Sequence, residues 1–403
     1  MITGNRFGWR PSNSIDQNLR KIPRDNYLTI VSIFGSLSGL VQGFLTTLSG
    51  MMLVDASFLQ ELYHYDSTFS IRFIMLFFAG EILGSLMSFP FSDTFGRRTT
   101  LIYTSIVCVL AIIWNVLTTS GADFLTSRFF VGWAMGILLS TSPVYTSEIS
   151  LTANRGYTIG MIGLTTVAGS MSAGLLYHLL KMYGIGWRAC MVVPIVVLIL
   201  KASVLSLLPE SPRWLLALHT PAECLESMRQ LRRTNDVSIE FNDIYLALSS
   251  DARLGETWID ILSSKTIRYR LFICCVIQLS QQMMGINIVT TFGTDFLRLL
   301  NVHSVLLGLS LAYVAAMMGT VLGLSQIDVR GRRFIFLFGT ISMGISWVGA
   351  ASCVYIGEMI FSKSLFLLIH SMRCDYDSIY CMGLLFSNFL FDFMPIFDIH
   401  HMI

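Results

Sequence analysis

One short polar stretch decides the fold of this chain, and it reads Ser92-Asp93-Thr94-Phe95-Gly96-Arg97-Arg98-Thr99. It lies between two apolar runs, each long enough to cross a lipid bilayer. The glycine allows the backbone angles of a sharp reversal, and the arginine pair favours the cytoplasmic surface of a membrane. The aspartate can pair with these arginines or lie at a neighbouring helix N-terminus. The stretch therefore predicts a tight loop that joins two membrane helices.

The same pattern returns once, as Ile327-Asp328-Val329-Arg330-Gly331-Arg332-Arg333-Phe334, again between two apolar runs. A single copy would be weak evidence, because any cytoplasmic turn can have this composition. Two copies in equivalent places of two halves indicate an internal duplication.

The composition is that of a membrane protein. Of the 403 residues, 54% are hydrophobic and only 13% are charged, whereas a soluble domain carries roughly 25% charged residues. The eight cysteines show no metal or disulfide spacing and lie mostly inside apolar runs, so we interpret them as small apolar side chains. No metal cluster, nucleophile constellation or phosphate-binding loop is visible. The sequence therefore predicts no cofactor, no metal and no enzyme activity.

The apolar runs predict an all-α polytopic membrane protein. A spanning helix needs about 20 mainly apolar residues, and nine segments meet this rule: 28–54, 71–91, 99–119, 124–146, 157–180, 187–208, 271–292, 304–327 and 334–357. The predicted organisation is a cytoplasmic tail (1–27), a complete six-helix bundle (28–208), a cytoplasmic linker with short helices (209–270), three helices of a second bundle (271–357) and an atypical tail (358–403). The tail has room for at most one marginal span, so the C-terminal bundle is predicted to be incomplete.

The distribution of Lys and Arg predicts the orientation. Five lie in the N-terminal tail and eight in the central linker, together with the arginine pairs of the two repeated loops. The segment 54–70, on the opposite side, has none. Because basic loops stay on the cytoplasmic side, the N-terminus is predicted to be cytoplasmic.

Two ionisable residues lie within or at the start of predicted spans, where each is costly unless it is paired or faces water. Glu81 is in the middle of the second span, and Arg128 opens the fourth. Arg128 either snorkels to the membrane surface or lies buried inside the bundle. Glycines at spacing four beside both residues predict close helix packing.

Opposite charges gather at the predicted cytoplasmic end of the first bundle. Glu148 closes the fourth span and Glu210 follows the sixth, on the side that also carries the basic residues Arg97, Arg98, Arg155 and Arg213. These groups either form a network that holds the helix ends together or are ordinary solvated charges, each exposed pair contributing only about 0–1 kcal/mol.

Four amides lie within ten residues of the seventh span: Gln278, Gln281, Gln282 and Asn287. Amides both donate and accept hydrogen bonds, which suits a ligand made of hydroxyl groups. The three glutamines share one helix face. The alternative is hydrogen bonding between helices.

With these residues in view, the chain resembles the sugar-porter family of the major facilitator superfamily. The resemblance covers roughly residues 28–357 and rests on motifs in the family's order: Asp93-x-x-Gly-Arg-Arg98, Arg128-x-x-x-Gly132, Pro143-x-Tyr-x-Ser-Glu148, Arg155-Gly156, Gly186-Trp-Arg188, Pro209-Glu-Ser-Pro-Arg-Trp214, Gln281-Gln-x-x-Gly-x-Asn287 and Asp328-x-x-Gly-Arg-Arg333. The resemblance implies two helix bundles, a central sugar site and alternating access. It also implies that Gln281, Gln282 and Asn287 bind sugar hydroxyls, with Thr320 kept nearby.

The positions at which the chain departs from the family pattern are as informative as the motifs that match it. The titratable carboxylate of the first span in proton-coupled members is replaced by Val41. The fifth-span glutamine and eighth-span asparagine fall at Gly163 and Ala316, and the two aromatics after the seventh-span asparagine are Thr291 and Phe292. No counterpart of the family's tenth-span segment appears.

The sequence thus predicts facilitative transport of a sugar or related polyol by alternating access. The expected partners are that small molecule and the lipid bilayer, with no nucleic acid, and the expected location is the plasma membrane. The gate network would comprise Asp93, Arg97, Arg98, Arg128, Glu148, Arg155, Glu210, Arg213, Asp328, Arg332 and Arg333. The alternative is a non-transporting relative, either a sensor or the inactive product of a degenerate gene.

Overall fold

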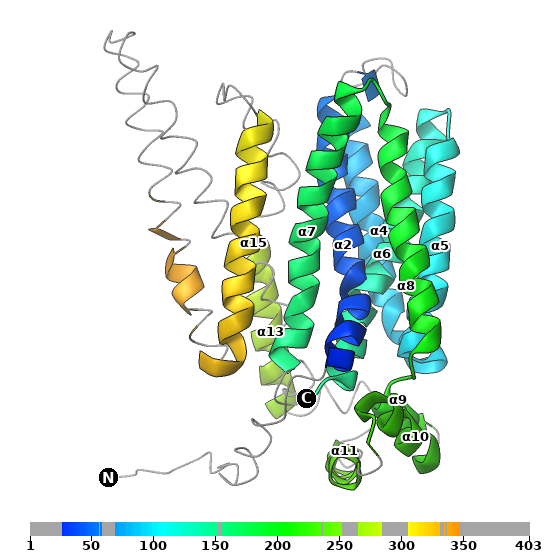
Figure 1. The fold of residues 1–403 in the computed structure, drawn as a ribbon, viewed down its shortest axis with the longest axis vertical. Coiled ribbons are helices and arrows are strands. Elements are labelled where there is room, and N and C mark those ends of the chain that lie inside the picture. The colour runs from blue at the N-terminus through cyan, green and yellow to red at the C-terminus, as the bar shows by residue number, and fades with distance from the viewer. Residues whose placement is uncertain are drawn as a thin grey trace.

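The computed structural model describes residues 26–55, 57–58, 69–151, 155–218, 220–234, 237–251, 265–283 and 305–330, with positions 334, 337–342, 344–345 and 348 beyond them. Its helices are α2 (Asn26–Val54), α4 (Phe69–Phe95), α5 (Arg97–Leu117), α6 (Gly121–Ile149), α7 (Arg155–Met182), α8 (Val192–Leu207), α9 (Pro212–Leu218), α10 (Pro221–Arg232), α11 (Ser238–Asp251), α13 (Lys265–Met283) and α15 (Val305–Arg330), and a short 3₁₀ helix, η2 (Trp187–Met191), leads into α8. This part of the chain contains no strand. Figure 1 shows the long helices standing side by side with α9–α11 grouped below one end.

Six of these helices are long and apolar enough to cross a membrane, judged by length and composition. They coincide with the first six predicted spans, and observed and predicted ends differ by a few residues. The apolar side chains that point away from the bundle, such as Leu110 and Leu117 of α5, are exposed. This pattern is expected of a helix that faces lipid on its outer side, since lipid tails solvate apolar side chains while the helix satisfies its own backbone.

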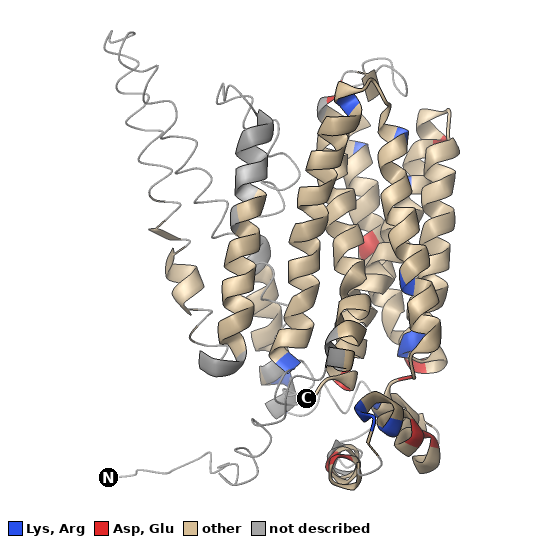
Figure 2. Cartoon of the chain, viewed as in Figure 1, with Lys and Arg blue, Asp and Glu red and all other residues tan. Residues whose placement is uncertain are grey.

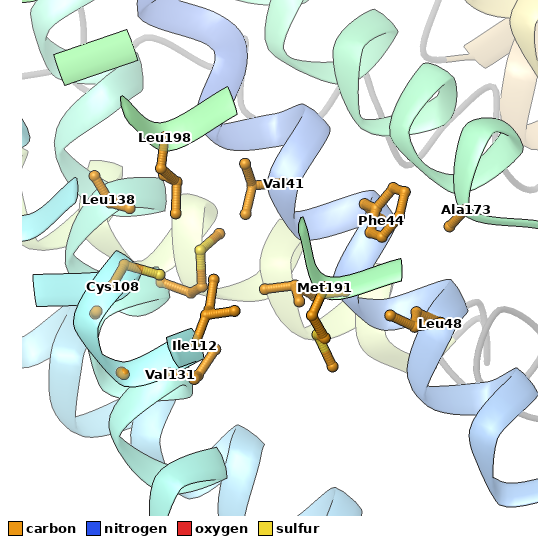
Figure 3. Close-up of a cluster of buried hydrophobic side chains, with 14 of the residues drawn as sticks. Val41, Phe44, Leu48, Cys108, Ile112, Val131, Leu138, Ala173, Met191 and Leu198 are labelled. Atoms are coloured by element: carbon orange, nitrogen blue, oxygen red, sulfur yellow. The ribbon is translucent and has the colours of Figure 1, made fainter. Parts of the chain in front are cut away.

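Helix α2 contributes to the core of the first six spans. This helix packs against α6, α7 and α8, while α4 packs on α6, and α5 on α6 and α8. Figure 3 shows the resulting cluster, in which Val41 and Phe44 of α2 lie with Ile112, Leu138 and Leu198 from three other helices. The position that lacks the family's carboxylate is therefore part of an apolar core.

Close packing of α4 on α6 depends on glycine, as the sequence predicted. A Cβ added at Gly80 would lie 2.2 Å from the carbonyl oxygen of Phe129, and one at Gly132 would lie 2.1 Å from that of Phe77. Real Cβ atoms do not approach so closely, so any larger residue would push the helices apart. The glycines bring the backbones together in the way that small residues do in membrane helix pairs.

The three short helices after α8 form a small unit with its own apolar cluster of Cys224, Met228 and Val237. Short helices were predicted for this linker, and α10 begins at Pro221. Proline suits the start of a helix because its φ is already helical. The helix dipole favours Glu223 in the first turn and the arginines in the last turn. Arg233 caps the end of this helix: its φ is 53°, and its backbone N–H donates to the carbonyl of Arg229 at 2.8 Å.

Beyond the linker, α15 lies along α7 (Figure 1). Leu324 and Ile327 of α15 pack against Ile159 and Met161 of α7 in a separate apolar cluster. Most of the predicted span 334–357 and all of the tail 358–403 lie outside the described residues.

Candidate functional site

The repeated loop forms a tight turn in its first copy. Helix α4 ends at Phe95 and α5 begins at Arg97, so Gly96 alone makes the connection. Its φ is 92°, a backbone conformation that residues with a side chain rarely adopt. The turn places the arginine pair in the first turn of α5.

Arg97 joins two acidic residues from different helices. Its Nη1 lies 2.9 Å from Oδ1 of Asp93, one turn earlier in the chain, and its Nε lies 3.2 Å from Oε2 of Glu148 at the end of α6. Ser211 donates a hydrogen bond of 2.5 Å to the same Glu148 oxygen. The exposed side-chain fractions are 14% for Arg97, 42% for Asp93 and 2% for Glu148, so the pair with Glu148 is the sheltered one.

Glu210 was predicted to join the network of charged side chains, and in the structure it bonds to backbone N–H groups at the start of α5. Its carboxylate accepts hydrogen bonds from the backbone N–H groups of Arg98 (2.8 Å) and Thr99 (3.3 Å), at the start of α5. The first N–H groups of a helix have no partner within the helix and carry partial positive charge, so a carboxylate stabilises them. Arg98 in turn donates to the carbonyl oxygens of Leu205 and Ser206 near the end of α8.

The linker helices are fastened to this same end. The indole N–H of Trp214 donates to the carbonyl of Asp93 at 2.9 Å, and Arg232 donates to the carbonyl of Ile149 at 3.0 Å. Arg155 begins α7 and Arg213 lies in α9, and both make further contacts in the structure. Figure 2 shows charged residues concentrated at this end of the helices and on α9–α11. We call Asp93, Arg97, Glu148, Glu210 and Ser211 the inner network.

Arg128 is buried inside the bundle and does not snorkel. Its guanidinium lies over the rings of Phe73 and Phe77, 4.4 and 4.8 Å from their centroids, and donates to the hydroxyl of Ser49. Stacking a cation over aromatic faces offsets part of the cost of burying the charge. Of the two alternatives that the sequence left open, the structure shows the interior one.

Glu81 is held by a residue that the sequence analysis did not single out. The amide of Gln42 in α2 donates to Glu81 Oε1 in α4 at 2.7 Å. The described residues show no ion pair between Glu81 and Arg128, although the two charges are close enough to interact electrostatically. Gln42 directly follows Val41, so an uncharged amide stands beside the position where the family pattern has a carboxylate.

Lys201 was also missed. It is fully buried in α8, and its ammonium makes one described hydrogen bond, of 3.3 Å to the hydroxyl of Ser142. That hydroxyl lies 2.6 Å from the hydroxyl of Ser38 in α2. The sequence could have indicated a buried functional or structural charge here, because a lone lysine inside an apolar run is costly in a membrane.

The opposite end of the bundle has its own ionic contact. Asp55, just after α2, accepts a 2.5 Å hydrogen bond from Tyr177 and lies 3.2 Å from the ammonium of Lys181. Arg188 donates to the carbonyl of Val116 at 3.1 Å. Segment 54–70 has no basic residue, but Lys181 and Arg188 also lie at this end and are engaged with the protein.

The predicted sugar site is described only in part. Gln281 and Gln282 lie in α13, but their side chains are outside the description, as are Asn287, Arg332, Arg333 and the side chain of Asp328 in the last turn of α15. Thr320 is buried in α15, and its hydroxyl donates to the carbonyl of Ala316 at 2.7 Å. The two positions that lack an amide, Gly163 and Ala316, are both buried.

The fold and these buried charges define a multi-pass α-helical membrane protein of the major facilitator type. The family described as "Sugar (and other) transporter" matches residues 28–377, and the chain belongs to this family. Similar proteins include Sugar transport protein 4 of Arabidopsis thaliana, 25% identical over 350 residues, which are 81% of this chain and 67% of that protein. Major facilitator-type transporter ecdD of Aspergillus rugulosus is 28% identical over 70% of this chain and 53% of its own length. Inositol transporter 4 of Arabidopsis thaliana is 24% identical over 87% of this chain and 60% of its own length. The match thus spans 53–67% of the length of these three relatives.

Solved structures support the fold. The proton:xylose symporter XylE bound to 6-bromo-6-deoxy-D-glucose superposes with a TM-score of 0.77 at 17% identity, over 92% of this chain and 80% of that one. A partially occluded inward open form of XylE from E. coli has a TM-score of 0.70 at 17% identity, covering 92% of this chain and 86% of that one. An inward open form of XylE has a TM-score of 0.63 at 16% identity, covering 92% of this chain and 91% of that one.

Proposed function

We propose that this protein moves a sugar or related polyol across a membrane by alternating access and without coupling to protons. Membership of the sugar transporter family supports the substrate class. The observation that carries the uncoupled mode is Val41, a valine in an apolar core where the sugar-porter pattern has a titratable carboxylate. The whole of α2, Asn26–Val54, contains no Asp or Glu. A symporter needs a group in the pathway that changes charge, and α2 offers none.

The second line of support is Arg128. Transport without proton coupling does not require Arg128 to pair with a carboxylate that gains and loses a proton. In the structure Arg128 contacts uncharged groups, namely Ser49 and two phenylalanine rings. Glu81 is the remaining carboxylate near it, and this group is held by Gln42.

We assign the substrate contacts to Gln281, Gln282, Asn287 and Thr320. Amides and hydroxyls both donate and accept hydrogen bonds, as an uncharged polyol requires. Thr320 is buried in α15, one turn from Ala316, whose carbonyl accepts its hydrogen bond.

We assign the closure of the inner end to the charged residues of the two repeated loops and their partners. In the first bundle these are Asp93, Arg97, Arg98, Glu148, Arg155, Glu210 and Arg213. Arg128, which the predicted network also includes, bonds to Ser49 near the opposite end of α2. In the second they are Asp328, Arg332 and Arg333. The ion pairs and the helix cap around Arg97 and Glu210 support this assignment, because they join α4, α5, α6 and the start of α9 at one end. The concentration of Lys and Arg at that end supports a cytoplasmic N-terminus, and we propose the plasma membrane as the location.

Uptake of labelled hexoses, pentoses and inositol into a transporter-null host tests the proposal. Gln281→Ala should raise KM about two- to tenfold, because one hydrogen bond to an uncharged ligand contributes about 0.5–1.5 kcal/mol. Gln278→Ala is the matched control, since Gln278 lies on the same helix with an exposed side chain. Equal effects of the two variants would contradict the site assignment.

Proton coupling is tested in the same cells with an external pH electrode. We expect no alkalinisation of a lightly buffered suspension when the sugar is added. Alkalinisation that disappears in Glu81→Gln would overturn the uncoupled mode and identify Glu81 as the coupling group. Sugar binding to purified protein without uptake would favour the alternative of a non-transporting sensor.

A further inference from the structure

One face of α15 lies against the first bundle along most of the helix. Tyr313, Ala316, Thr320, Leu324 and Ile327 recur at spacings of three and four, which places them on one face, and all five are buried. The two ends of this face make different contacts. Leu324 and Ile327 pack on apolar side chains of α7, whereas Tyr313 makes a polar contact.

The hydroxyl of Tyr313 lies 3.1 Å from the hydroxyl of Thr47 in α2, and both side chains are buried. The two residues are 266 positions apart in the chain, so this hydrogen bond joins the first bundle to a helix of the second half. Tyr313 also belongs to the main apolar core. The bond is therefore shielded from water and from competing partners.

The bond lies toward the end away from the inner network. Arg233 stacks over Tyr27 at 4.1 Å, which places the start of α2 at the inner end beside the linker helices. Thr47 is about two turns before the far end of α2, and Tyr313 is about two turns after the start of α15. The apolar contacts of Leu324 and Ile327 lie near the other end of α15, where α7 begins.

We propose that the Thr47–Tyr313 hydrogen bond is the tie that keeps the transport pathway closed on the side away from the inner network. The proposal rests on the alternating-access function. In that mechanism the two bundles rock against each other around a central site. A bond between α2 and α15 cannot persist when these helices separate, so it stabilises the closed arrangement relative to the open one.

The tie also adjoins the inferred substrate site. Ala316, where the sugar-porter pattern has an amide, is one turn from Tyr313 on the same face. Opening the pathway leaves two hydroxyls that need new partners, and water or the hydroxyls of a polyol can supply them. Tyr313 is thus a positioning residue whose hydroxyl biases the equilibrium between the two states.

The test measures that equilibrium directly in the full-length chain in lipid nanodiscs. Spin labels are attached through p-acetylphenylalanine at Ser57 and Val305, near the far end of α2 and at the start of α15, so that native cysteines stay in place. Tyr313→Phe and Thr47→Val should each increase the ratio of open to closed distances about two- to tenfold, the range expected for one hydrogen bond. Because both changes remove the same bond, the double variant should show no further increase.

Two controls separate the tie from general damage. Thr46→Val removes the neighbouring hydroxyl, whose described hydrogen bond is to the carbonyl of Gln42 within α2 at 2.8 Å, and should leave the distances unchanged. Thr47→Ser keeps the hydroxyl and should restore the wild-type ratio. If neither Tyr313→Phe nor Thr47→Val changes the ratio, or if Thr46→Val changes it equally, the tie is refuted. The measurement needs no sugar, so a shifted ratio together with absent uptake would contradict the proposed function and leave this inference standing.

Discussion

Arg97 contacts two carboxylates that differ mainly in burial, and this allows a matched prediction about the inner network. Glu148→Gln and Asp93→Asn each remove one negative charge while keeping a similar shape. The Glu148 side chain is 2% exposed and the Asp93 side chain 42% exposed, although the two distances to Arg97 are similar at 3.2 and 2.9 Å. A difference between the two variants therefore reports on the burial of Glu148 together with its hydrogen bond from Ser211.

The expected magnitudes follow from the surroundings of each group. Removing one partner of a fully buried ion pair costs about 3–5 kcal/mol. Arg97 keeps Asp93 as a second partner, and Glu148 also loses its charge-assisted bond from Ser211, so we expect a cost of about 1.5–3 kcal/mol for Glu148→Gln. An exposed pair contributes about 0.2–1 kcal/mol, which is the expectation for Asp93→Asn.

The assay is unfolding of the purified protein in detergent, with Arg97→Gln added to complete a double-mutant cycle for each carboxylate. The coupling energy between Arg97 and Glu148 should exceed about 1 kcal/mol, and that between Arg97 and Asp93 should fall below it. As an independent measurement, Glu148→Lys should lower abundance at the cell surface, and adding Arg97→Glu should recover part of the loss. Equal costs for the two carboxylates, or purely additive effects in the charge swap, would refute the reasoning.

Three further predictions concern other parts of the molecule. Lys201→Met should raise the stability to unfolding by about 1–4 kcal/mol, because the buried ammonium has one described hydrogen bond and an apolar side chain of similar size removes the cost of burying a charge; destabilisation in the same assay would contradict this. Desolvation acts to raise the pKa of Asp55, but hydrogen bonds from Tyr177, Ser57 and Lys181 outweigh it and hold that pKa below the usual value. The contribution of Asp55 should therefore be constant above about pH 4 and disappear as the pH falls through its lowered pKa, so Asp55→Asn should melt below wild type at pH 7 and converge with it in acid. Burial, followed by the charge of Glu240, raises the pKa of the Cys224 thiol to about 11, so this cysteine should resist a maleimide at pH 7.5 in the folded protein and react after unfolding, as mass spectrometry would show.

The sequence by itself determined the features that depend on local composition. The first six spans were predictable because about 20 apolar residues must form a helix when they cross a bilayer. The turn at Gly96 was predictable because its φ of 92° favours a residue without a side chain. Close packing through the glycines of α4 and α6 was predictable from their spacing of four, which puts them on one helix face, but that the two helices pack on each other was not.

The partners of the buried polar groups were decided by the tertiary structure alone. Gln42 reaches Glu81 across 39 positions, Glu210 caps α5 across 112, and Thr47 meets Tyr313 across 266. The sequence had not indicated Gln42 as a partner for Glu81 and had placed Glu210 among the arginines. A sequence shows which side chains need partners. Which partner each one receives depends on how the helices are rotated and how deeply they pack, and these are set by the whole bundle at once.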